Sequence, residues 1–404
     1  MQLITCFLEQ GWQITFASAA SEGERRADLK ALGIREVAIE LNSSSFDTFV
    51  HKLRPDVVLF DQFLMEEQFG WRVEKHVPQA LRVLESCDLQ SLRHTRHHLL
   101  KELLKAGNDE SADHYQPLFS PPDAALFRRM AQTDLAQREV ASFYRCDLSL
   151  VVSDVEIELL TRYFQVPMAL LHWCPLMLRD LPPGANGFDD RVHFLTIGNF
   201  RHAPNWDAVL WLKTTVWPMI RQQLPGAQVH VYGAYTPPKA TALHNRAQGF
   251  HIMDWAEDAL TVMSDARVSL APLRFGAGIK GKVLDAMACG TPTVTTPVGA
   301  EAMHGDLPFP GAVARDAQGL ADEAVRLYRD RTLWEQAQRA GWQVLQARFR
   351  HEQHCAALVA RIHELLENLE AHRAANFTGA MLRHHQHKST QYMSQWIEAK
   401  NRKL

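Results

Sequence analysis

The sequence predicts an α/β protein with two successive domains, each built on a doubly wound parallel sheet. Short apolar runs bounded by polar or turn residues alternate with longer segments of helical periodicity, a pattern typical of strands buried between two layers of helices. Residues 179–191 contain two prolines and two glycines without apolar periodicity, so we expect a linker there. The length of 404 residues suits two domains of roughly 100–200 residues each.

The first predicted domain, residues 1–178, opens differently from a typical doubly wound domain. Such a domain begins with a strand and a glycine turn, whereas Leu3–Glu9 already has a helical pattern. We therefore expect its first strand to be missing from this sequence. The expected strands are Gln13–Ser18, Val57–Phe60, Ala80–Leu84 and Leu148–Ser153, and the clearest helical patterns are Asp123–Tyr144 and Asp154–Phe164.

The second predicted domain covers residues 192–350, and residues 351–404 form a C-terminal helix and tail. A long helical pattern runs over Arg348–Ala375, and the polar, basic stretch after residue 382 is typical of a solvated tail or of a contact with an anionic membrane. The expected strands of this second domain are Val192–Ile197, Gln228–Tyr232, Phe250–Met253, Arg267–Ala271 and Thr293–Thr296.

Composition gives the protein class and its expected location. Hydrophobic residues make up 46% and charged residues 22%, as in ordinary globular proteins, and the formal net charge of −3 gives no reason to expect a nucleic-acid partner. No apolar run reaches about 18 residues, so we expect no transmembrane segment. The six cysteines lie far apart without a C-x-x-C pair, which favours buried free thiols in a reducing compartment. We therefore predict a cytoplasmic protein, with peripheral contact at the inner face of the membrane as an option.

The stretch from Leu270 to Gly299 carries most of the expected chemistry. A strand leads into a loop with Gly276, Gly278 and Gly281, followed by a helix that we expect from about residue 282 to 289. Glycines allow a close backbone approach to a ligand, and the helix start carries partial positive charge. Lys280 and Lys282 lie at that same positive end, which makes sense if an anion such as a diphosphate binds there. The alternative is that both lysines point to water.

Asp285 follows Lys282 by three residues and lies on the same helix face. Its carboxylate could accept hydrogen bonds from the hydroxyl pair of a ribose while the lysines hold the phosphates. The alternative is a simple ion pair with Lys282.

This segment, LDAMACGTPTVTTPVGAE, resembles the donor-binding signature of retaining glycosyltransferases of group 1, or family 4, which have two facing Rossmann-like domains (the GT-B fold). In that signature two glutamates are separated by seven residues. The second acidic position is Asp285 here, while the first falls on Ala277, which departs from the pattern at the residue that contacts the donor sugar. The loop through Ile279 is similar to the GxGIKxK variant found in part of the family.

Two further loops resemble the same family. In IGNFRHAPNWDA, after the first strand of the second domain, Gly198 is in place and Asn199 stands at the usual Arg position, with Arg201 and His202 as substitutes. We expect Asn205 to cap the following helix. In HIMDWAED, the resemblance implies that Asp254 and Trp255 border the nucleobase, and the alternative for this tryptophan is core packing.

Acidic residues follow two strands of the first domain, at the sheet edge where doubly wound proteins bind ligands. The resemblance implies that this domain binds a glycan or lipid-linked acceptor, and the candidate residues are Asp61, Glu66, Glu67 and Asp88. For the charged run 93–98, a solvated helix face is the alternative to a ligand contact. The His-rich runs 94–98, 351–354 and 384–387 lack an evident acidic or Cys partner, so we assign no metal ligand.

The resemblance implies a metal-independent glycosyltransferase that moves a sugar from a nucleoside-diphosphate sugar to an acceptor hydroxyl with retention. Lys280, Lys282 and Arg201 would stabilise the negative charge of the departing diphosphate. The nucleotide sugar is the substrate, and no cofactor is expected. The alternatives are a non-catalytic nucleotide-sugar-binding protein and a nucleotide-sugar epimerase, both with the same fold.

Overall fold

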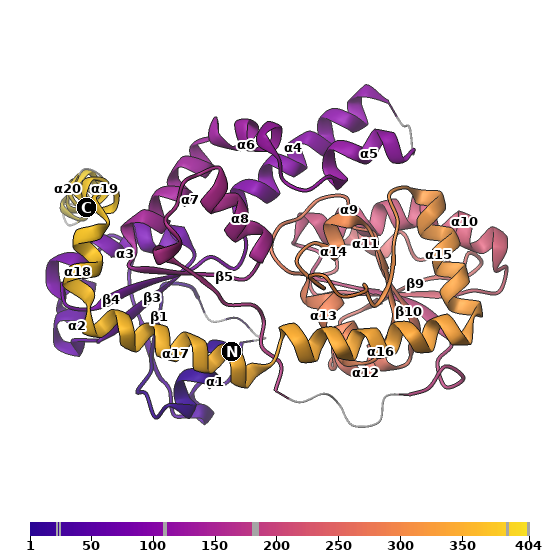
Figure 1. Ribbon diagram of the computed structural model, residues 1–404, viewed down its shortest axis with the longest axis horizontal. Coiled ribbons are helices and arrows are strands. Elements are labelled where there is room, and N and C mark those ends of the chain that lie inside the picture. The colour runs from indigo at the N-terminus through magenta and orange to yellow at the C-terminus, as the bar shows by residue number, and fades with distance from the viewer. Residues whose placement is uncertain (22, 24–25, 108–110, 180–185, 385–387, 402–404) are drawn as a thin grey trace. The chain divides into compact units, whose positions relative to one another are not determined.

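The computed structural model describes residues 1–21, 23, 26–107, 111–179, 186–384 and 388–401, and the predicted linker therefore lies partly outside the described residues. The chain forms two compact units (Figure 1). Unit 1 comprises Met1–Cys87, Thr133–Met177 and His351–Leu404, and unit 2 comprises Asp88–Gln132 and Leu178–Arg350. The helices of residues 88–132 thus pack within unit 2, although they precede the predicted linker in the sequence.

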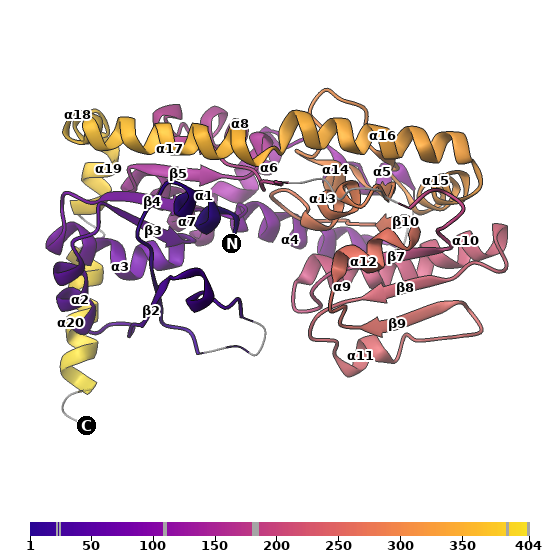
Figure 2. The same ribbon diagram turned by 90° about the horizontal axis from the view of Figure 1, so that it is seen from below.

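Unit 2 contains a six-stranded parallel sheet with the order β12-β11-β10-β7-β8-β9. Figure 2 shows β10, β7, β8 and β9 side by side in this order. All five predicted strands are confirmed, and the three-residue strand β12 was missed because it is too short to show a pattern. The strands are β7 His193–Ile197, β8 Val229–Tyr232, β9 Phe250–Asp254, β10 Ala266–Ala271, β11 Thr293–Thr295 and β12 Gly311–Val313.

Helices cover both faces of this sheet, which explains why its strands are apolar on both sides. One face is covered by α9 Ala203–Trp211, which continues through a π-type turn at Leu212–Val216 into α10 Trp217–Gln223, and by α15 Ala317–Arg329. The other face is covered by α12 Ala259–Ser264, α13 Gly281–Ala288 and α16 Arg331–Arg348. The short helices α11 Pro238–Thr241 and α14 Pro297–Ala300 complete this part of unit 2.

Residues 88–132 pack against the rest of unit 2 through a shared apolar core and a hydrogen bond to Tyr115. Their helices are α4 Gln90–Ala106, α5 Ala112–Phe119 and α6 Ala124–Ala131. Leu99 and Tyr115 are buried in the same cluster as Trp211. Arg274, at the end of β10, donates two hydrogen bonds to Asp207 and a third to the hydroxyl oxygen of Tyr115. These contacts fix α4 beside the loop that follows β10.

Unit 1 contains a four-stranded parallel sheet, β3-β4-β5-β6, and a separate parallel pair, β1-β2. The strands are β1 Thr15–Ser18, β2 Arg35–Ala38, β3 Val57–Asp61, β4 Leu81–Glu85, β5 Leu148–Val151 and β6 Leu171–Trp173. The four predicted strands are observed, and β2 and β6 were missed. The helices before residue 133 are α1 Gln2–Glu9, the 3-10 turn Lys30–Leu32, α2 Ser45–Leu53 and α3 Phe63–His76.

Two of the predicted helices are interrupted in the structure. The pattern over 123–144 divides into α6 and α7 Asp134–Arg145, because the Thr133 hydroxyl accepts from the Ala136 amide and starts a new helix. The pattern over 348–375 divides into the end of α16, then α17 His351–Glu367 and α18 Leu369–Ala375. Unit 1 also contains α8 Asp154–Arg162 and the 3-10 turn Met168–Leu170.

The C-terminal tail is helical rather than frayed in its described part. It forms α19 Phe377–Leu382 and α20 Lys388–Asn401. Buried Ser394 accepts a hydrogen bond from the Arg72 guanidinium, so α20 is attached to α3. Arg402 and Lys403, which contributed to the predicted basic tail, lie outside the described residues. Among the described residues, no helix combines the length and the apolar character needed to cross a bilayer.

The cysteine prediction was wrong for one pair. Cys6 on α1 and Cys355 on α17 form a disulfide, with their Cα atoms 5.6 Å apart. The pair is 349 residues apart in sequence, so only the tertiary contact between the two helices reveals it. Cys146, Cys174 and Cys289 are buried free thiols as predicted, and Cys87 is free and exposed. Cysteine usage therefore no longer argues for a reducing compartment.

A buried ion network in unit 1 joins its sheet to its C-terminal helices. The Asp147 carboxylate accepts hydrogen bonds from Arg82 on β4 and from Arg373 on α18. Burial raises the pKa of Asp147, but the hydrogen bonds from Arg373 and the charge of Arg82 outweigh it and lower the pKa from 3.8 to about 2.

We expect Asp147→Asn to lower the free energy of unfolding of unit 1 by about 3 kcal/mol, because Arg82 and Arg373 lose their counter-charge. In the wild type this stabilisation is complete above pH 4 and is lost as the pH falls through about 2, since the folded-state pKa lies below the unfolded one. Urea denaturation at pH 7 measures the difference. Glu158→Gln, in an exposed pair with Arg162, is the control and should leave the midpoint nearly unchanged. Equal midpoints for the two variants would contradict the role of Asp147.

Candidate active site

The loop between β10 and α13 ends at the N-terminus of α13, where no side chain caps the helix. Gly278 has a φ of +62°, a conformation that favours glycine, and α13 begins at Gly281, one residue before the predicted start. Lys280 is the N-cap and provides no side-chain cap. The amides of Val283 and Leu284 donate to the Lys280 carbonyl oxygen. The amides of Gly281 and Lys282 precede the first helical hydrogen bond and give this end a partial positive charge that favours an anion.

The two lysines of this loop do not point to water. Lys280 is 8% exposed, and its Nζ donates to the carbonyl oxygen of Gly278 at 2.5 Å. Lys282 is partly buried, and its Nζ donates to Oδ1 of Asn205 at 2.8 Å. Burial lowers the pKa of Lys282 from 10.5 to about 8. The alternative of two solvated lysines is therefore wrong.

Asp285 makes no ion pair with Lys282, because Lys282 turns to Asn205 instead. The carboxylate is partly buried, and this burial raises the pKa of Asp285 from 3.8 to about 6. Asp285 is therefore largely ionised at neutral pH and able to accept hydrogen bonds.

The junction between β7 and α9 lies directly beside Lys282. A side chain at Gly198 would place its Cβ 2.6 Å from Nδ2 of Asn205 and 2.9 Å from Nζ of Lys282, so it would have to push these two side chains aside. Asn205 is not the predicted N-cap, since α9 begins at Ala203 after His202. The Asn205 side chain instead donates to the carbonyl oxygen of Asn199 at 3.0 Å and accepts from Lys282. It therefore joins the two strand-to-helix junctions.

Helix α4 adds cations to this loop that were considered in the sequence but were not among the predicted site residues. Arg96 is 1% exposed and donates to the carbonyl oxygen of Gly276 at 2.9 Å. It also forms a bidentate pair with Glu301, at 2.9 and 2.6 Å. The solvated-face alternative for residues 93–98 is thus wrong for Arg96. The apolar residues at positions 92 and 99, four before and three after it, were the available signal that this face is buried.

Arg93, also on α4, pairs with Asp88 and lies near His202, with 3.5 Å between its Nη1 and the His202 Nε2. Desolvation of the ring, followed by the charges of Arg93, Lys282 and Lys280, lowers the pKa of His202 from 6.5 to about 4. His202 is therefore neutral at pH 7.

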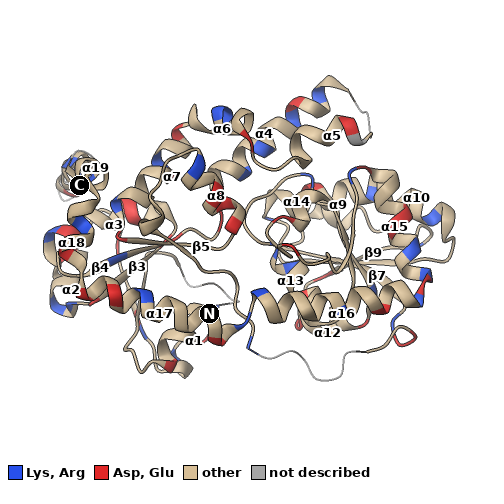
Figure 3. Cartoon of the chain, in the orientation of Figure 1, with Lys and Arg blue, Asp and Glu red and all other residues tan. Residues whose placement is uncertain are grey.

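Two carboxylates, those of Asp88 and Glu301, lie beside these cations, and the cations shift their pKa values. Burial raises the pKa of Asp88, although Arg93 and Lys280 partly offset this effect. Burial also raises the pKa of Glu301, but Arg96 and Lys280 outweigh it and lower the net value. The cations of the cluster, Arg93, Arg96, Lys280 and Lys282, outnumber these two carboxylates. Elsewhere, acidic and basic residues are interspersed along the helices (Figure 3), so this local excess of positive charge favours an anionic ligand.

Other predicted donor residues lie at the ends of neighbouring strands. The Arg201 guanidinium lies over the Tyr235 ring, 3.7 Å from the ring centroid. Its contact is therefore with this ring and does not join it to Lys280 and Lys282. Asp254, with a φ of +59°, ends β9, and Trp255 follows it with 47% of its surface exposed. The core-packing alternative for Trp255 is therefore wrong. Ile279 is partly buried in the loop before Lys280.

The predicted acceptor residues differ in their surroundings. Asp61 is exposed at the end of β3 in unit 1, whereas Asp88 belongs to unit 2. Glu66 is buried in a bidentate pair with Arg145, and Glu67 is paired with Arg138. An acceptor contact for Glu66 or Glu67 would require these ion pairs to open.

Residues 191–330 match the protein family described as Glycosyl transferases group 1. This match covers 140 of the 404 residues. The match covers both strand-to-helix junctions that surround Gly198 and Lys282. No curated protein matches the sequence.

Solved structures with a similar fold include glycosyltransferases. Sucrose-phosphate synthase from Thermosynechococcus elongatus has a TM-score of 0.64 and 16% identity, over 91% of this chain and 92% of that one. Anabaena HepE, in complex with UDP and glucose, has a TM-score of 0.60 and 11% identity, over 90% and 95%. A variant of S. aureus TarM, in complex with Fondaparinux, alpha-GlcNAc-glycerol and UDP, has a TM-score of 0.57 and 10% identity, over 78% of this chain. This chain spans only 58% of the TarM variant.

The two parallel sheets and these matches confirm the predicted GT-B fold. At sequence identities of 10–16%, the similarity to these structures shows only that the fold is shared. The part of the chain that matches this family model has its excess of cations at the carboxyl ends of β7 and β10, where doubly wound sheets bind ligands.

We expect Gly198→Ala to weaken nucleoside-diphosphate binding at least tenfold, because the added methyl displaces Asn205 and Lys282 from each other. Isothermal titration calorimetry with UDP, GDP and dTDP measures this effect. Gly226→Ala is the matched control, since its Cβ would have no neighbour within 4 Å. Undiminished affinity in a folded Gly198→Ala variant would show that the ligand binds elsewhere.

Proposed function

We propose that the protein transfers a sugar from a nucleoside-diphosphate sugar to an acceptor hydroxyl, with retention and without a metal ion. The observation that carries the proposal is the convergence of Gly198, Asn205 and Lys282 beside the uncapped N-terminus of α13. This arrangement offers a diphosphate both helix amides and an ammonium group. Retention and metal independence are carried over from the resemblance to group 1 glycosyltransferases.

In the proposed reaction, the bond between the anomeric carbon and the diphosphate oxygen breaks. The acceptor oxygen forms a new bond to that carbon on the same face, and the acceptor hydroxyl gives its proton to the departing diphosphate oxygen. Negative charge grows on the departing diphosphate, and Lys282 and the first amides of α13 stabilise it. Lys280 holds the loop in place through its carbonyl contacts and adds to the positive potential. Arg201 would have to leave the Tyr235 ring to reach the diphosphate.

The contacts proposed for the ribose and the nucleobase follow from the burial of Asp285 and the position of Trp255. Asp285, ionised at neutral pH, accepts hydrogen bonds from the ribose hydroxyl pair. The exposed ring of Trp255 at the end of β9 provides a stacking surface for the nucleobase. The acceptor is a glycan or lipid-linked hydroxyl compound, in line with the resemblance.

A non-catalytic nucleotide-sugar-binding protein is the second candidate. Two departures from the family pattern favour it: Ala277 replaces the acidic residue that contacts the sugar, and Asn199 replaces an arginine. The Ala277 methyl is buried and cannot contact a sugar hydroxyl through a hydrogen bond. The two candidates differ in turnover, since a binding protein would retain the intact donor.

The deciding experiment incubates the protein with UDP-, GDP- and dTDP-sugars and follows nucleotide release, with and without glycan and lipid-linked acceptors. UDP-sugars come first because HepE and the TarM variant both contain UDP. Catalysed release that rises with an acceptor supports the transferase. Binding without release supports the binding protein, and conversion of the sugar without an acceptor would indicate an epimerase.

We expect Lys282→Ala to weaken diphosphate binding by about 2 kcal/mol, or roughly 30-fold, because a charged hydrogen bond is lost. In the wild type, affinity should be full below pH 8 and fall above it, since the pKa of about 8 marks where Lys282 loses its proton. Calorimetric titrations between pH 6 and 9.5 measure both effects. Lys213→Ala, on the π-type turn, is the control. A pH dependence that persists in Lys282→Ala would contradict the role of this amine.

We also propose peripheral contact with an anionic membrane through α20. Tyr392, Met393 and Trp396 are each at least 58% exposed on this helix. Lys388 begins the helix, and Lys400 in its last turn lies over the Trp396 ring. Exposed aromatic residues next to lysines are typical of helices that lie in a membrane interface.

We expect Trp396→Ser to weaken binding to vesicles with anionic lipid roughly tenfold, because the ring no longer inserts into the interface. Co-sedimentation with vesicles measures the bound fraction, and binding should also fall at high salt. Phe16→Ser, an exposed aromatic on β1, is the matched control. Equal binding by the two variants would exclude α20 as the contact.

A further inference from the structure

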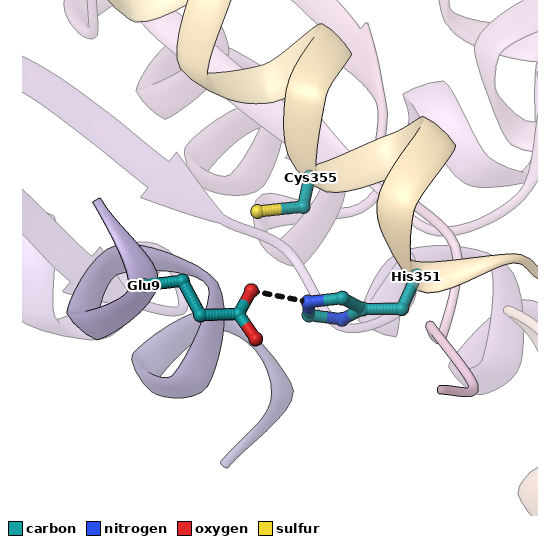
Figure 4. A group of neighbouring side chains, drawn as sticks. All are labelled: Glu9, His351 and Cys355. Atoms are coloured by element: carbon teal, nitrogen blue, oxygen red, sulfur yellow. Dashed lines mark hydrogen bonds and ion pairs between the residues drawn. The ribbon is translucent and has the colours of Figure 1, made fainter. Parts of the chain in front are cut away.

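A second chemically distinctive cluster lies in unit 1, between α1 and α17. Cys6 and Glu9 are three residues apart on α1, and His351 and Cys355 are four apart on α17, so each pair shares one helix face. Figure 4 shows Glu9, His351 and Cys355 directed toward one another. One possible ligand atom from each of these three residues lies within 4.8 Å of the other two, and Nε2 of His351 is 2.8 Å from Oε2 of Glu9.

The cluster is buried on one side and open on the other. Cys6 is fully buried, and Cys355 and His351 are 4% exposed each. The two cysteines belong to an apolar core cluster that includes residues of β4 and β5. Glu9 remains at the surface with 40% of its side chain exposed. An ion could therefore reach the cluster from the Glu9 side and be held in a largely dry environment.

The chemistry of the cluster depends on the state of the two sulfurs. The Cys6–Cys355 disulfide offers no thiolate. A dithiol reductant supplies two electrons and two protons, becomes a disulfide itself, and leaves two thiols on this chain. Loss of the two thiol protons then gives two thiolates next to an imidazole and a carboxylate. This set of two sulfurs, one nitrogen and one oxygen suits tetrahedral Zn²⁺ and excludes hard ions such as Mg²⁺.

We propose that the reduced chain binds one zinc-like divalent cation through Cys6, Glu9, His351 and Cys355. Zinc bond lengths of about 2.0–2.3 Å place tetrahedral ligand atoms roughly 3.3–3.8 Å apart. The present ligand atoms of Glu9, His351 and Cys355 are already within 4.8 Å, so small side-chain rotations suffice. The disulfide and the metal are then two alternative links between α1 and α17, chosen by the redox state.

Sequence reasoning had assigned no metal to the His-rich run 351–354. Cys355 stands four residues after His351, a spacing that places both ligands on one helical face. The other two ligands come from the opposite end of the chain, and only the packing of α1 on α17 supplies them. The cluster belongs to unit 1, whereas the candidate active site belongs to unit 2. The proposal therefore does not rest on the proposed function.

The test uses the full chain, reduced with a phosphine, freed of metal and titrated with Co²⁺ without oxygen. We expect one equivalent to give a thiolate-to-cobalt charge-transfer band with the visible bands of a tetrahedral site, and Zn²⁺ to displace it. The oxidised chain should give no such band. A reduced chain that binds no Co²⁺, or whose bound Co²⁺ shows no thiolate band, would overturn the proposal. The two cysteines would then serve only to form the disulfide.

Variants separate the metal site from the disulfide. His351→Gln should lower Co²⁺ affinity at least tenfold while the disulfide still forms on oxidation, as measured by thiol labelling and mass spectrometry. Cys355→Ser should abolish both. His354→Gln, a buried histidine on the same helix, and Cys87→Ser, an exposed free thiol, are matched controls that should keep full affinity. Loss of the thiolate band in Cys87→Ser, or unchanged affinity in His351→Gln, would contradict the assignment.

Discussion

The candidate site in unit 2 depends on positive charge that converges on two adjacent strand-to-helix junctions. Strand β10 pairs with β7 in the parallel sheet, so the loops that leave their carboxyl ends are neighbours. Gly198 removes the side chain that would otherwise separate them, and Asn205 hydrogen-bonds across to Lys282. Burial disfavours the charge of Lys282, and a bound anion would offset that cost.

The surrounding elements each fix one part of this cluster. Arg96 on α4 donates a hydrogen bond to the Gly276 carbonyl oxygen in the loop after β10. The Glu301 carboxylate accepts from the same guanidinium and fixes its position. The hydrogen bond from Arg274 to Tyr115 and the shared apolar core hold the segment 88–132, and with it α4, against the second sheet. This explains why a segment that precedes the linker in the sequence packs with the second sheet. The same surroundings keep His202 neutral while Lys282 remains protonated at neutral pH.

The sequence could predict those features that local patterns encode. The alternating strands and helices, the glycine loop and the positions of Lys280, Lys282 and Gly198 depend on neighbours within a few residues. Features that depend on contacts between distant segments were not predictable. Arg96 meets Glu301 across 205 residues, and Cys6 meets Cys355 across 349. Glu66 was a candidate ligand by position in the sequence, but Arg145 on α7 pairs with it.

The most direct measurement is a crystal structure of the full chain with bound UDP. We predict diphosphate oxygens within hydrogen-bond distance of the Lys282 Nζ and of the first amides of α13, next to Gly198. A diphosphate bound away from both junctions, with Lys282 still donating only to Asn205, would contradict the assignment of this site.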